Sequence, residues 1–114
     1  MEEARLSELR DVIPHDVTLV AVSKFHPAEA VRAAYDAGQR VFGESRADEL
    51  AAKAAALPDD ICWHFIGHVQ TNKLRRILPH VEMIQSVDSE KLLRLIDAEA
   101  VKMGLHTKVL LQVH

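Results

Sequence analysis

A single lysine, Lys24, stands at the end of the apolar segment Val17–Val22, where a buried strand would meet its following loop. This segment is apolar and rich in β-branched residues on both faces, as expected of a parallel strand covered by helices. An amine at the tip of such a strand is sheltered yet reachable, and desolvation disfavours its charged form. Lys24 is therefore a candidate to form a Schiff base with a carbonyl compound. Most lysines at strand ends simply extend into water, so the position alone leaves both roles open.

Polar residues follow the other expected strands at the same end of each strand. They are Glu44 with Ser45, His68, Ser86 with Asp88, and His114. The carboxyl ends of parallel strands meet on one side, where α/β sheets and barrels bind their ligands. The sequence therefore predicts a shared pocket, although Ser45 and Asp88 are also adequately explained as helix caps.

Three other kinds of site are disfavoured. Cys62, His64 and His68 carry zinc-binding atoms, but their spacing straddles a strand and a loop without a second ligand pair, so no metal site is predicted. His64 alternates with Trp63 and Phe65, which favours a hydrogen-bonded place inside the sheet. The chain has no Gly-x-Ser-x-Gly elbow and its four glycines are isolated, which argues against a serine hydrolase and a phosphate-binding glycine loop.

The elements that must position these residues alternate along the chain. Strands are expected at 17–22, 40–43, 61–66, 81–87 and 107–113. Helices are expected at about 2–13, 27–38, 45–56 with Ser45 and Asp48 as a capping box, 71–78, and from Asp88 or Ser89 to Gly104. Strict alternation predicts right-handed βαβ units and a parallel sheet, either open or part of a barrel. Residues 1–114 are expected to form a single domain.

Composition excludes several classes of partner. The 114 residues are 48% hydrophobic, which suffices for one domain with a core. Lys and Arg number 14 against 17 Asp and Glu without a block of like charge, so neither nucleic acid nor a membrane surface is expected as a partner. The single cysteine, Cys62, and the charged first residues favour a reducing cytoplasm, and no apolar run reaches the roughly 18 residues of a membrane span.

Six ordered blocks of sequence closely resemble the pyridoxal phosphate homeostasis protein family. They are Leu19–Lys24, Phe42–Glu44, Trp63–His68, Gln70–Lys73, Ser86–Ser89 and Leu110–Val113. The resemblance implies a barrel related to the N-terminal barrel of alanine racemase. The implied fold is α/β, a partial (β/α)8 TIM-type barrel with about five parallel strands and an extra N-terminal helix.

The same resemblance implies a cofactor and its site. Lys24 is implied to hold pyridoxal 5′-phosphate as a Schiff base, with Ser45, His64 and Ser86 as lining residues. Ser45 and His114 stand where the family usually has Asn. Members of the family resemble intracellular carriers or regulators of the cofactor and not enzymes, and their implied partners are the cofactor and apo-enzymes that require it.

Two alternatives stay open. One is a pyridoxal phosphate-dependent amino-acid racemase, although the sole tyrosine, Tyr35, is expected on an outward-facing helix. The other is a truncated structural or interaction fragment that binds no cofactor. The family's chain continues for about as many residues again and a closed (β/α)8 barrel takes at least about 200 residues, so we expect an incomplete barrel, a weakened phosphate site and a poorly stable monomer of unspecified oligomeric state.

Overall fold

Five parallel strands and the helices between them make up a computed structural model that describes residues 8–9, 11–14 and 16–112. The strands are β1 (Ala21–Val22), β2 (Val41–Glu44), β3 (Cys62–Phe65), β4 (Val81–Val87) and β5 (Lys108–Leu111). They form one sheet in the order β1-β2-β3-β4-β5. The connecting helices are α2 (Ala28–Asp36), α3 (Ala47–Ala56), the 3-10 helix η1 (Thr71–Lys73) with α4 (Leu74–Ile77), and α5 (Glu90–Met103). This arrangement confirms the predicted α/β alternation and the parallel sheet.

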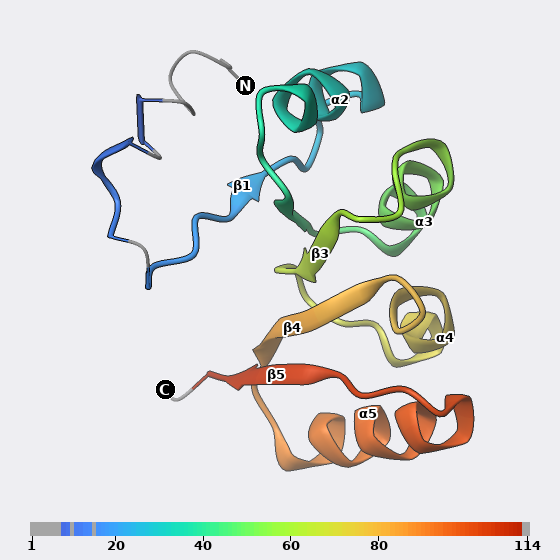
Figure 1. Cartoon of the computed structure of the whole chain (residues 1–114). Helices are drawn as coiled ribbons and strands as arrows, with labels where there is room; N and C mark the ends of the chain where they lie inside the picture. The colour runs from blue at the N-terminus through green and yellow to red at the C-terminus, as the bar shows by residue number, and fades with distance from the viewer. Residues whose placement is uncertain (1–7, 10, 15, 113–114) are drawn as a thin grey trace.

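The helices cover one face of the sheet, as Figure 1 shows. The core lies between that face and the helices, and its fully buried members include Val31 of α2, Leu50 of α3, Phe42 of β2 and Ile84 of β4. The Phe42 and Trp63 rings on neighbouring strands are tilted against each other with centroids 5.9 Å apart. Within the described residues β1 and β5 are the two edges of the sheet, so the five strands form an open sheet and not a closed barrel.

The first strand is much shorter than its apolar run suggests. The expected strand over 17–22 is reduced to Ala21–Val22, which pairs with Phe42 and Gly43 of β2. The Gln39 side-chain amide donates to the carbonyl oxygens of Leu19 and Val41 at 2.7 and 2.8 Å, so a side chain takes the place of a further rung of the ladder. Val17 and Val22 are exposed, and the expectation that this strand is covered on both faces is therefore wrong.

Helix ends follow the sequence signals in some places only. Ser89 caps α5, because its side chain accepts a hydrogen bond from the Leu92 N–H at 3.1 Å, and Gly104 ends that helix in the left-handed conformation. The predicted capping box of Ser45 and Asp48 is wrong. Arg46 is the N-cap residue of α3, and it makes no side-chain cap hydrogen bond.

The predicted helix over 2–13 and the predicted site residue His114 lie largely or wholly outside the described residues. The predicted helix at 71–78 is divided into η1 and α4, and the strand predicted at 107–113 is described over Lys108–Leu111. None of the helices in the described part of the chain is long and apolar enough to cross a membrane.

Candidate functional site

Lys24 lies in the turn that directly follows β1, and its side chain is exposed. Its Nζ lies 6.0 Å from the centre of the Phe25 ring, and among the described residues it makes no hydrogen bond or ion pair. The expectation that neighbouring strands shelter this amine is wrong for this chain. The cause is the one-sided cover of the sheet, since Val22 is also 48% exposed. The amine is reachable, but it is not desolvated.

A buried polar network lies behind this turn and joins β1, β2 and α3. The Lys53 ammonium donates to the Ser23 carbonyl oxygen at 2.9 Å, to Glu44 Oε2 at 2.9 Å and to Glu49 Oε1 at 3.0 Å. The Ser23 hydroxyl donates to the same Glu44 carboxylate. The Phe25 N–H donates to Glu49 Oε1 at 2.9 Å. The network therefore contacts the backbone on both sides of Lys24.

The charges of this network are withdrawn from water. Lys53 is 5% exposed and Glu44 is fully buried. A buried ion pair is costly unless hydrogen bonds satisfy its remaining groups. Lys53 uses all three of its donors, and Glu44 Oε2 accepts from Lys53 and from the Ser23 hydroxyl, whereas Glu44 Oε1 is buried without a hydrogen-bond partner among the described residues. Burial raises the pKa of Glu49, but hydrogen bonds from Lys53 and the Phe25 N–H, with the Lys53 charge, outweigh burial and leave this pKa below its ordinary value. Glu49 is therefore held as a carboxylate.

Phe25 adopts an unusual backbone conformation in the same turn. Its φ of 67° lies in the left-handed region, which bulky side chains rarely enter. Such a conformation costs about 1–2 kcal/mol and persists only where surrounding contacts impose it. The bond from the Phe25 N–H to Glu49 is a contact of that kind.

His64 is buried in β3, as the alternation of Trp63, His64 and Phe65 predicts. The Gln85 amide donates to His64 Nδ1 at 2.8 Å, which leaves the proton of the neutral ring on Nε2. Burial lowers the pKa of His64, and the Glu82 carboxylate, 3.8 Å from Nε2, offsets this only in part. His64 is therefore a neutral, hydrogen-bonded residue of the sheet.

Cys62 lies on the same strand and shares Glu82 with His64. Burial raises the pKa of the Cys62 thiol, and its hydrogen bond to the Glu82 carboxylate raises it further. A thiol held in its protonated form is a poor nucleophile and a poor metal ligand. No group of three His, Cys, Asp or Glu residues within the described ranges could hold a metal ion.

The loops after β2 and β3 approach each other closely at Gly67. A side chain there would meet Ser45, because an added Cβ would lie 2.7 Å from the Ser45 Cβ and 2.8 Å from its Cα. The Ser86 hydroxyl, from β4, donates to the Gly67 carbonyl oxygen. Gly67 thus lies against Ser45, which follows β2, and accepts a hydrogen bond from Ser86 of β4, so it links the ends of three strands.

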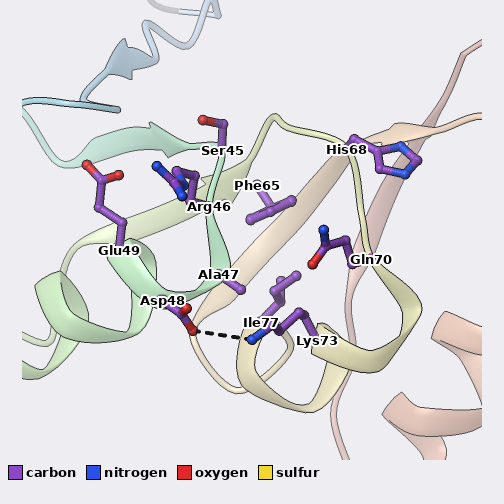
Figure 2. Close-up of a pocket in the computed structure, with 10 residues that line it drawn as sticks. All are labelled: Ser45, Arg46, Ala47, Asp48, Glu49, Phe65, His68, Gln70, Lys73 and Ile77. Atoms are coloured by element: carbon purple, nitrogen blue, oxygen red, sulfur yellow. Dashed lines mark ion pairs between the residues drawn. The ribbon is translucent and has the colours of Figure 1, made fainter.

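A pocket of about 370 Å³ opens beside these loops, between α3 and the η1–α4 segment. Figure 2 shows its lining residues: Ser45, Arg46, Ala47, Asp48, Glu49, Phe65, His68, Gln70, Lys73 and Ile77. Lys73 Nζ and Asp48 form an ion pair across it at 3.7 Å. Lys24, His64 and Ser86 lie outside this pocket, so it is not the common pocket that the sequence predicts.

Sequence reasoning missed the buried network around Lys53. The signal was present, because Lys53 follows Leu50 by three residues and therefore lies on the buried stripe of α3. A lysine on that stripe needs a buried acceptor, and Glu44 at the end of the neighbouring strand provides one.

Comparison with known proteins gives the family. Residues 3–114 match the N-terminal domain of alanine racemase. The chain belongs to the alanine racemase N-terminal domain family. Within that family, it is 43% identical over 101 residues to the pyridoxal phosphate homeostasis protein of Schizosaccharomyces pombe, across 87% of this chain and 43% of the relative. It is 36% identical to the human protein of the same name, across the whole chain and 45% of the relative.

Solved structures of the same family agree with the fold. PipY of Synechococcus elongatus, solved with PLP bound, superposes with a TM-score of 0.92 at 47% identity, across 98% of this chain and 54% of PipY. Alanine racemase from Streptomyces coelicolor superposes with a TM-score of 0.77 at 25% identity, across 98% of this chain and 31% of the racemase. The resemblance seen in the sequence is confirmed, and the chain spans about half the length of the curated relatives it matches.

Proposed function

We propose that this chain binds pyridoxal 5′-phosphate and takes part in intracellular homeostasis of that cofactor, with Lys24 as the point of covalent attachment. The similarity to PipY, which was solved with PLP bound, carries the proposal. It extends over nearly the whole chain, so the turn that bears Lys24 lies inside the matched region.

The residues present fit an aldehyde cofactor at Lys24. The amine is exposed and has no hydrogen-bond or ion-pair partner in the described part of the chain, so it is free to react. Pyridoxal phosphate supplies an aldehyde carbon and a ring that draws electrons from it. The unprotonated Lys24 amine adds to that carbon and, with loss of one water, forms a carbon–nitrogen double bond that water can break again. Reversible attachment suits a carrier that passes the cofactor to apo-enzymes in the cytoplasm.

The other predicted lining residues have structural partners already. His64 is bonded to Gln85, and Ser86 to the Gly67 carbonyl. Ser45 lies against Gly67, whose carbonyl oxygen accepts the bond from Ser86. We assign these three residues to shaping the loops around the cofactor, and no chemical step to any of them.

The racemase alternative requires an acid or base opposite Lys24, and the sole tyrosine is engaged elsewhere. The Tyr35 hydroxyl donates to Asp60 at 2.6 Å, and the Arg40 guanidinium lies 3.8 Å from the centre of its ring. Both contacts tie the Tyr35 side chain, near the end of α2, to residues that precede β2 and β3, and neither involves the turn that bears Lys24. A binding role without turnover is therefore the better fit to these residues.

Reductive trapping tests the proposal. The protein is mixed with pyridoxal phosphate below one equivalent, reduced with borohydride, digested and mapped by mass spectrometry. We expect the label on Lys24, with loss of that label in Lys24→Arg and its retention in the control Lys102→Arg, which alters an exposed lysine of α5. Label spread evenly over the exposed lysines, or absent from Lys24, would show the proposal to be wrong.

A further inference from the structure

We propose that Lys53 is a positioning residue for Lys24, acting through a clamp made of Ser23, Glu44, Glu49 and Lys53. This inference rests on the proposed function, because it gives Lys24 the reactive role. It gives a second lysine a different role, since the buried ammonium of Lys53 fixes the backbone from which the reactive amine of Lys24 extends.

The clamp holds both peptide groups that flank Lys24. On one side, the Ser23 carbonyl oxygen accepts from Lys53 Nζ at 2.9 Å. On the other side, the Phe25 N–H donates to Glu49 Oε1 at 2.9 Å, and the same oxygen accepts from Lys53 at 3.0 Å. One ammonium group therefore links the two bonds, and the Cα of Lys24 is fixed between them.

The strand side of the clamp is anchored in the sheet. The Ser23 N–H donates to the Gly43 carbonyl at 3.0 Å, and the Ser23 hydroxyl donates to the Glu44 carboxylate. Glu44 is fully buried and forms an ion pair with Lys53 at 2.9 Å. The clamp thus connects the turn to β2 and to α3, two elements of the core, and the turn cannot shift without breaking a buried charged bond.

The two lysines have opposite surroundings, which separates their roles. Lys53 is 5% exposed and all three of its donors are used, so its nitrogen has no free position for an aldehyde. Lys24 is exposed and has no such partners among the described residues. Ser23 is fully buried, whereas the next residue, Lys24, is exposed. The chain therefore passes from the core to solvent between these two residues.

The left-handed conformation of Phe25 supports the same assignment. A bulky residue with a φ of 67° needs outside contacts to stay there, and the clamp supplies the bond to its N–H. Release of that bond allows Phe25 to return to an ordinary conformation, which redirects the chain at Lys24. Misplacement of a reacting group by about 1 Å lowers its reactivity by up to roughly 100-fold.

The test combines trapping with hydrogen exchange on Lys53→Met, Lys53→Arg, Glu49→Ala and the control Lys102→Met. In Lys53→Met we expect Lys24 trapping by pyridoxal phosphate to fall by roughly tenfold or more relative to trapping at Lys102 in the same molecules. The Phe25 amide should also exchange faster. Lys53→Arg keeps the charge and the donors, so it should restore part of both signals. Lys102→Met should leave Lys24 trapping and the Phe25 amide unchanged.

Glu49→Ala covers the case in which Lys53→Met does not fold. The Glu49 side chain is one quarter exposed, and its loss removes only the acceptor of the Phe25 N–H and one of the three Lys53 bonds. The same two changes, weaker trapping at Lys24 and a faster Phe25 amide, are expected. A folded variant of either kind that traps the cofactor at Lys24 as the wild type does overturns the inference.

The two proposals fail in different ways. If the wild-type protein takes no label on Lys24, the proposed function is wrong. Hydrogen exchange of the Phe25 amide in the Lys53 and Glu49 variants still tests whether the clamp holds the turn, because it needs no cofactor. If the label is on Lys24 but neither signal responds to Lys53, only the positioning role is wrong. Label found on Lys53 itself would contradict the assignment of roles to the two lysines.

Discussion

Replacement of Gly67 by alanine should destabilise the protein more than its small size suggests. The added Cβ would lie 2.7 Å from the Ser45 Cβ and 2.8 Å from its Cα. Non-bonded carbon atoms pack at about 3.5–4.0 Å, so the loops after β2 and β3 must separate by about 1 Å. The obstacle includes backbone, which cannot rotate away as a long side chain can.

The expected cost follows from two contributions. Overpacking in a closely packed region costs about 1–3 kcal/mol. Separation of the loops also strains the hydrogen bond from Ser86 to the Gly67 carbonyl, which adds about 1 kcal/mol. A total of about 3 kcal/mol corresponds to a urea midpoint lowered by about 1.5 M when the m-value is about 2 kcal/mol/M.

Urea unfolding, followed by the fluorescence of Trp63, measures the change. The matched control is Gly104→Ala, where nothing lies within 4 Å of the added Cβ and only the left-handed φ of 69° opposes it. That control should cost about 1–2 kcal/mol, the penalty of a left-handed φ for a residue with a Cβ. Equal or greater stability of Gly67→Ala relative to Gly104→Ala, at an unchanged m-value, would refute the close approach of the two loops.

Three further predictions concern single residues. Ser89→Ala removes the cap of α5 and should lower the free energy of unfolding by about 1 kcal/mol in urea titrations; no change would mean that the bond to the Leu92 N–H contributes nothing. Leu50→Ala empties a fully buried site and should cost about 2–5 kcal/mol in the same assay, and a cost below about 1 kcal/mol would argue against its place in the core. Burial lowers the pKa of His64 below its ordinary value of 6.5, so the unfolded state takes up the proton at a higher pH than the folded state does. The contribution of His64 to the free energy of unfolding should therefore be full above about pH 6.5 and be lost as the pH falls toward the pKa of His64 in the folded state. His64→Gln should show a smaller loss between about pH 7.5 and 5.5, and an equal loss would assign the effect to another group.

Periodicity in the sequence predicts most of the architecture because each strand and helix buries an apolar stripe. β4 is found at 81–87 as expected, and the hydrogen-bonded place of His64 inside the sheet is also confirmed. The parallel order needs no further information, since strands joined by helices return in the same direction.

The sequence predictions are wrong where a side chain from elsewhere in the chain decides the local structure. The apolar run before Lys24 predicts a six-residue strand, but the Gln39 amide occupies the Leu19 carbonyl and the strand is short. The prediction that Lys24 is sheltered is also wrong, because an apolar strand alone does not show which of its faces is covered. The helical pattern places Lys53 on the buried stripe of α3, but its partner Glu44 lies nine residues earlier on β2, and no local pattern shows that Glu44 is buried.

The register of the sheet has a kinetic consequence. Ala21 pairs with Phe42, and Phe42 with Trp63, so successive partners are 21 residues apart. Closing a loop of this length costs about 2.7 kcal/mol of chain entropy beyond a constant, and this cost is the same for the two pairings. The strand pairs in the described part of the chain are all parallel, so no hairpin among them can start assembly, and we expect refolding to be slow for a chain of this size and to show no single early strand pair.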